Sequence, residues 1–126
     1  EVGGHGRAVL SADFSRDGKH VITAGADDTA RLWTTADGKM FEKLSGHTAP
    51  VTSASFSADG LRAVTGSRDS GVKLWDVTNG KELLSLKGHT SEVNVVRFSP
   101  TGGTILSAGA DGTAILWPTT PWQELK

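Results

Sequence analysis

The stretch GHTAPVTSASFSADGLRAVTGSRDSGVKLWD, residues 46–76, contains a pattern that the 126-residue chain repeats on either side. Nine of its positions carry the same residue 42 positions earlier and again 42 positions later. These positions are Gly46, His47, Val51, Phe56, Ser57, Gly60, Asp69, Leu74 and Trp75. A fixed period near 40 residues indicates one supersecondary unit stacked on copies of itself. Function is therefore to be sought on a repeat array rather than in a pocket of a single globule.

Each repeat predicts four short β-strands. In the middle repeat they cover residues 51–56, 62–67, 72–75 and 83–86. Val51, Ala54 and Phe56 are spaced by three and then two, whereas a regular strand alternates by two, so a bulge is expected near the start of the first strand. Asp59-Gly60 and Asn79-Gly80 are typical of tight hairpins. Nothing between the strands has helical length or periodicity, so the fold class is all-β with antiparallel sheets.

Composition narrows the classes of protein to which the chain can belong. The formal net charge of -1 provides no basic surface for nucleic acid. No apolar run approaches the roughly 20 residues that span a bilayer, so no membrane association is expected. The first residues lack the basic and apolar regions of a signal peptide. Without cysteine there is neither a disulfide framework nor a thiolate zinc site, and an intracellular location is favoured.

The repeated Gly-His, the Asp six residues before Trp, and the Trp75-Asp76 pair resemble the WD40 repeat. The resemblance covers essentially the whole chain. It implies a β-propeller, in which each four-stranded sheet is a blade around a central channel. The chain would then be a single array, residues 1–126, of three blades at roughly 8–45, 51–87 and 93–126.

The outer repeats depart from the family pattern. Only the middle repeat keeps Asp after Trp, because the other two have Trp33-Thr34 and Trp117-Pro118. The last repeat also has Pro118 and Pro121 where the earlier repeats have an Asp-Gly or Asn-Gly turn. Proline removes a donor from a strand ladder. The fourth strand of the last blade is therefore the least secure of the predicted strands.

In WD40 proteins a His, a Ser or Thr, an Asp and a Trp form a buried hydrogen-bonded tetrad in each blade. The resemblance places the tetrads at His5, Thr23, Asp27 and Trp33; at His47, Thr65, Asp69 and Trp75; and at His89, Ser107, Asp111 and Trp117. The donors and acceptors of these four groups can satisfy one another. We interpret the tetrads as stability elements.

The alternative for this constellation is a hydroxyl–His–Asp hydrolase triad. It is disfavoured because the set occurs three times, because two copies carry Thr, and because a Trp donor would cap the hydroxyl. No other pattern predicts a catalytic group, a metal site or a cofactor, and the chain is not expected to be an enzyme.

In WD40 proteins the face with the Gly-His loops and the turns between the second and third strands is the commonest partner-binding face. The resemblance maps this face to loops that contain Arg7, Thr48, Arg68, Thr90 and Glu92. Arg68 is the best candidate, because Arg is enriched at interface hot spots. The plainer reading of each residue is a solvated loop group. The sequence thus predicts a non-catalytic scaffold for protein partners of unknown identity.

Three blades do not close a ring, since propellers typically have 4–8. The faces left bare would be apolar and would drive association. Two copies would give six blades, and this homodimer is the favoured expectation; a fragment of a longer propeller and a ring shared with another chain stay open. The alternative function is accordingly a structural module that oligomerises into a closed ring.

Overall fold

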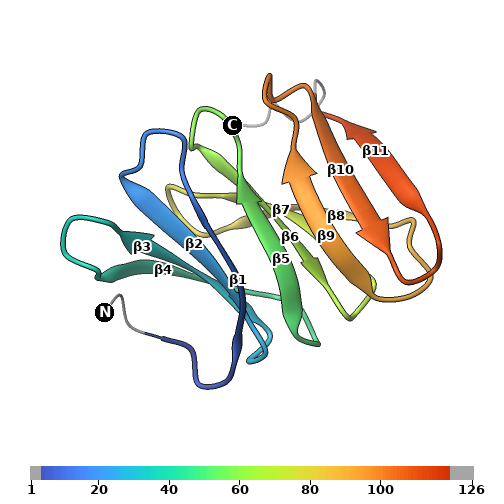
Figure 1. The fold of residues 1–126 in the computed structure, drawn as a ribbon, viewed down its shortest axis with the longest axis horizontal. Coiled ribbons are helices and arrows are strands. Elements are labelled where there is room, and N and C mark those ends of the chain that lie inside the picture. The colour runs from blue at the N-terminus through green and yellow to red at the C-terminus, as the bar shows by residue number, and fades with distance from the viewer. Residues whose placement is uncertain (1–3, 120–126) are drawn as a thin grey trace.

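The computed structural model describes residues 4–119, and every regular element in this part of the chain is a β-strand (Figure 1). The first repeat contains β1 (Val9–Phe14), β2 (His20–Gly25), β3 (Thr29–Thr34) and β4 (Met40–Ser45). The second contains β5 (Val51–Phe56), β6 (Arg62–Ser67), β7 (Val72–Asp76) and β8 (Glu82–Leu86). The third contains β9 (Val93–Phe98), β10 (Thr104–Gly109) and β11 (Ala114–Pro118). Within the described residues no helix is long and apolar enough to cross a membrane.

Each repeat forms its own antiparallel sheet, and the three sheets are named blade 1, blade 2 and blade 3 below. The strand order is β1-β2-β3-β4 in blade 1 and β5-β6-β7-β8 in blade 2. Blade 3 has the order β9-β10-β11. The predicted all-β architecture of antiparallel blades is confirmed. The fourth strand predicted for the last repeat, near Leu125, lies outside the described residues.

The first strand of a blade carries the irregularity that the spacing of its apolar residues predicts. The pairing of β1 with β2 shifts between Val9 and Ser11, and that of β5 with β6 shifts between Val51 and Ser53. The hairpin after β5 depends on Gly60, which has a φ of 74°. Glycine adopts this left-handed conformation without the steric cost that a Cβ would add. The shift and the turn together set which side chains of the strand face the neighbouring blade.

The hydrophobic core lies between the blades. The first strands β1, β5 and β9 lie next to one another, and the sheets fan out from them (Figure 1). One buried cluster joins Leu32 of blade 1 to Phe56 of blade 2, and a second joins Leu74 of blade 2 to Val96 of blade 3. The fan is open, so one face of each outer blade is left without a neighbouring blade among the described residues.

Candidate functional site

A chain of hydrogen bonds links four side chains of blade 2 that lie far apart in the sequence. The indole N–H of Trp75 donates to Oγ1 of Thr65 at 2.8 Å, and this oxygen lies 2.7 Å from Nε2 of His47. Nδ1 of His47 lies 2.8 Å from Oδ2 of Asp69. The hydroxyl can accept from Trp75 and donate its own proton to Nε2, and Nδ1 then donates to the carboxylate. A neutral imidazole therefore satisfies every hydrogen bond of the arrangement.

Burial favours the neutral form of His47. Removal from water lowers the pKa of His47, although the hydrogen bond and the charge of Asp69 act in the opposite direction. Thr65 and Trp75 are buried as well. Among the described residues, no buried side-chain nitrogen or oxygen lacks a hydrogen-bond partner. The tetrad thus lets polar atoms lie inside the blade without leaving any of them unpaired.

The carboxylate of the tetrad also holds two stretches of backbone. Oδ2 of Asp69 accepts the N–H of Thr48 at 3.0 Å, and Oδ1 accepts the N–H of Gly71 at 2.7 Å. Burial acts to raise the pKa of Asp69, but hydrogen bonds from Thr48, His47 and Gly71 outweigh it and lower the pKa below its ordinary value. One charged side chain thereby ties the Gly-His loop to the turn between β6 and β7.

Blade 1 contains the same arrangement with one added cation. Nε2 of His5 lies 2.6 Å from Oγ1 of Thr23, and Nδ1 lies 2.9 Å from Oδ1 of Asp27. The indole N–H of Trp33 donates to the hydroxyl of Thr23 at 2.9 Å. The guanidinium of Arg31 lies 3.0 Å from the other oxygen of Asp27. This carboxylate therefore makes both the tetrad and an ion pair with the third strand.

Blade 3 builds its tetrad with serine in place of threonine. Oγ of Ser107 lies 2.7 Å from Nε2 of His89 and accepts the indole N–H of Trp117 at 2.9 Å. Nδ1 of His89 lies 3.1 Å from Oδ2 of Asp111. The same oxygen accepts the N–H of Thr90 at 2.9 Å. The structure thus brings together all the tetrad residues that the resemblance to the WD40 repeat implies, and the carboxylate of Asp111 anchors the loop residue after His89 as in blade 2.

The tetrad geometry is unsuited to nucleophilic catalysis. A hydrolase triad needs a hydroxyl that faces the substrate next to an oxyanion hole. The hydroxyls of Thr65 and Ser107 are completely buried, and each accepts a hydrogen bond from a tryptophan. In the part of the chain that the structure describes, no three His, Asp or Glu side chains are grouped so as to hold a metal ion.

Of the five residues predicted to face a partner, two form an ion pair and the other three lie separately in exposed loops. Arg68, after β6, and Glu92, before β9, approach each other across the boundary between blades 2 and 3, with Nε and Oε2 4.0 Å apart. Both side chains are half exposed. Thr48 and Thr90 are exposed in the Gly-His loops, and tetrad carboxylates hold their N–H groups. Arg7 is exposed in the loop before β1 and has no ion-pair partner within residues 4–119.

A cleft lies beside the blade 2 tetrad, and the sequence did not predict it. It has a volume of about 330 Å³, and its lining includes Thr48, Asp69, Lys73 and Lys87. Nζ of Lys73 lies 3.0 Å from Oε2 of Glu82, while Lys87 is exposed. The period offered one signal for Lys73, because Arg31 occupies the same position one repeat earlier. Nothing in the sequence indicated that Lys87 would join it.

Comparison with known protein families gives a match in each of the three repeats. The family model described as WD domain, G-beta repeat, matches residues 1–34, 38–76 and 80–118. A search of curated proteins found no match. The matched segments end 42 residues apart and include the Gly-His of all three repeats and all three tetrad Trp residues. The chain therefore belongs to the WD40-repeat family.

Proposed function

We propose that the chain is a non-catalytic protein-interaction scaffold that binds its partner on the face formed by the Gly-His loops. WD40 repeats generally act as scaffolds for protein–protein interaction, and the family is typically non-catalytic. The observation that carries the proposal is the double role of each tetrad carboxylate. Asp69 and Asp111 each accept from a histidine and from the N–H of the following loop residue, so the loops are held by a buried framework. Loops on a rigid scaffold are the usual site of binding groups.

The boundary between blades 2 and 3 is the best centre for this face. Arg68 and Glu92 form an exposed pair, and such pairs contribute little to stability. A carboxylate on a partner can therefore replace Glu92 beside Arg68 at small cost. The cleft with Lys73 and Lys87 lies beside the tetrad of blade 2, includes Thr48 of the same face and offers further donors. These features favour a protein segment that carries acidic side chains.

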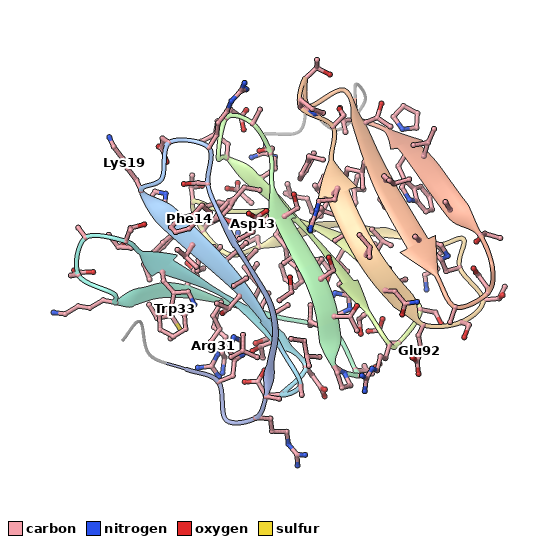
Figure 2. All side chains as sticks on the ribbon, in the orientation of Figure 1. Asp13, Phe14, Lys19, Arg31, Trp33 and Glu92 are labelled. Atoms are coloured by element: carbon pink, nitrogen blue, oxygen red, sulfur yellow. The ribbon has the colours of Figure 1, made fainter. Side chains whose placement is uncertain are left out.

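Charge reversal at Arg68 tests the proposal. Arg68→Glu removes the cation and places two carboxylates side by side, so partner binding should fall at least about tenfold. The matched control is Lys19→Glu, which makes the same change of charge on the hairpin after β1, at the other end of the blades from Glu92 (Figure 2). Quantitative affinity purification of the wild-type chain and both variants gives the comparison. Equal recovery of partners by Arg68→Glu and the wild type would contradict the assignment of the face.

The second candidate is a structural module whose role is assembly into a closed ring. It is favoured by the apolar residues left exposed on the outer faces of blades 1 and 3, which include Phe14 and Leu116. Mass in solution separates the two candidates, because a stable monomer would remove the assembly function and leave the scaffold function intact.

A further inference from the structure

The tetrad of blade 2 lacks a hydroxyl that the other two tetrads use. In blade 1, Oγ1 of Thr29 donates to Oδ1 of Asp27 at 2.8 Å. In blade 3, Oγ1 of Thr113 donates to Oδ1 of Asp111 at 2.6 Å. Gly71 occupies the matching position of blade 2, 42 residues from each threonine, and has no side chain to make this hydrogen bond. The carboxylate of blade 2 is therefore one donor short of its counterparts.

Oδ1 of Asp69 keeps an open acceptor position as a result. Oδ2 of this carboxylate accepts from His47 and from the N–H of Thr48. Within residues 4–119, the one hydrogen bond to Oδ1 comes from the N–H of Gly71 at 2.7 Å. A carboxylate has about four lone-pair positions, so an acceptor position is left on Oδ1. The side chain of Asp69 is 13% exposed, so a group from outside the chain can reach it.

The cleft beside the blade 2 tetrad includes the position where the threonine side chain is missing. Gly71 and Asp69 both line this cleft, which has a volume of about 330 Å³. A Cβ on Gly71 would lie 2.8 Å from Oδ1 of Asp69 and 3.6 Å from Cε1 of His47. A side chain here would therefore occupy the part of the cleft next to the carboxylate, as Thr29 and Thr113 do in their own blades. In the described part of blade 2, this place is open to a ligand.

The other groups around the cleft select the kind of ligand. Its lining includes Lys73 and Lys87. Nζ of Lys73 is paired with Oε2 of Glu82 at 3.0 Å, whereas Lys87 is exposed and has no ion-pair partner among the described residues. An ammonium group of a ligand would be repelled by the lysines, and a carboxylate next to Asp69 would be repelled by Asp69 itself. A neutral donor at Asp69 and an anion at Lys87 therefore suit the cleft.

We propose that this cleft binds a serine or threonine side chain of the protein partner, with an acidic residue beside it in the partner's sequence. The hydroxyl donates to Oδ1 of Asp69, as the threonine does in each outer blade, and the acidic side chain pairs with Lys87. The inference rests on the proposed partner-binding face, because Thr48 belongs both to that face and to the lining of the cleft. It adds the residue type that the face selects, since the exposed pair of Arg68 and Glu92 recognises charge alone.

A pair of peptides tests the role of the hydroxyl. The probes are acetyl-Gly-Thr-Glu-Glu-Gly-amide and the same peptide with valine in place of threonine, which has a similar shape but no hydroxyl. Each is titrated into the isotopically labelled wild-type chain. NMR resonances of the N–H groups of Thr48 and Gly71 report binding, because Asp69 holds both groups. The threonine peptide should bind at least about tenfold more tightly, because the valine peptide buries the acceptor of Asp69 without a donor.

Variants of the chain separate the hydroxyl from the charge. Gly71→Thr supplies the chain's own hydroxyl to Asp69, so it should weaken binding of the threonine peptide at least about tenfold and remove the preference for it. Blades 1 and 3 fold with threonine at this position, so the variant should melt no lower than the wild type. Gly71→Ser carries the smaller hydroxyl-bearing side chain and should have the same effect. Lys87→Gln is the matched control in the cleft, and it should weaken both peptides alike and leave their ratio unchanged.

The outcomes distinguish this inference from the assignment of the face. Equal binding of the two peptides, binding of neither, or a threonine preference that survives in Gly71→Thr and Gly71→Ser would overturn the inference and leave the cleft to solvent. Charge reversal at Arg68 is scored instead by recovery of partners. If Arg68→Glu recovers partners as well as the wild type while the threonine preference is found, the assignment of the face fails and the cleft still binds a hydroxyl group.

Discussion

Blade 2 and the outer blades carry the same apolar residue types, but only blade 2 buries both of its faces. Phe56 is buried while Phe14 at the matching position is exposed, and Leu74 is buried while Leu116 is exposed. The local sequence of a repeat is thus enough to form strands and a tetrad. The environment of its apolar faces depends on whether a neighbouring blade is present, as expected for an array whose repeats contact only their neighbours.

The largest expected effect comes from truncating a leucine side chain to alanine on a blade face that a neighbouring blade covers, compared with the same truncation on a face that is exposed. Leu74→Ala should lower the free energy of unfolding by about 2–5 kcal/mol, because it leaves a cavity between blades 2 and 3. Leu116→Ala truncates a side chain that is 68% exposed and should cost less than about 1 kcal/mol. Urea denaturation followed by tryptophan fluorescence measures both values. Equal costs for the two substitutions would show that the two faces do not differ.

Removal of a tetrad carboxylate should have the next largest effect. Asp69→Ala leaves the imidazole of His47 and the N–H groups of Thr48 and Gly71 without their acceptor, which should cost about 2–4 kcal/mol. The control is Asp76→Thr, which installs the residue found one repeat earlier at Thr34 and should cost less than about 1 kcal/mol. Thermal melts test the comparison. An unchanged midpoint for Asp69→Ala, together with loss of an esterase activity, would favour the triad over the structural tetrad.

The tetrad of blade 2 also makes stability depend on pH in two windows. The pKa of His47 is lowered from 6.5, so below that pH the unfolded chain binds a proton that the folded chain does not, and stability falls as pH decreases. The pKa of Asp69 is lowered from 3.8, so a second loss begins near that value and continues until the folded carboxyl is protonated. Urea midpoints measured from pH 8 to pH 3 should show both losses. His47→Gln should flatten the upper window, and a slope equal to that of the wild type would contradict this account.

Much of the blade could be predicted because its determinants repeat along the chain. The strands and the bulge near Val51 follow from local spacing, and the resemblance to the WD40 repeat names every side chain that the structure joins in a tetrad. The approach of Arg68 to Glu92 and the cleft at Lys87 could not be predicted in this way. The first depends on how blades 2 and 3 lie against each other, and the second on how the loops of blade 2 lie beside β8; Arg68, Glu92 and Lys87 each occur in only one repeat. The exposure of Leu116 was foreseen only as a consequence of an incomplete ring.

The smallest expected effect concerns the turn between the second and third strands. One position of this turn is serine in blade 2 and glycine in blade 3. Ser70 has a φ of 73°, while Gly112 at the matching position of blade 3 has a φ of 84°. A Cβ is disfavoured in this conformation, so Ser70→Gly should raise the free energy of unfolding by about 0.5–1 kcal/mol after the added freedom of the unfolded chain is included. Gly112→Ser should lower it by a similar amount. Ser70→Ala keeps the Cβ and serves as the control, so a gain from Ser70→Ala as large as that from Ser70→Gly would show that the backbone conformation is not the cause.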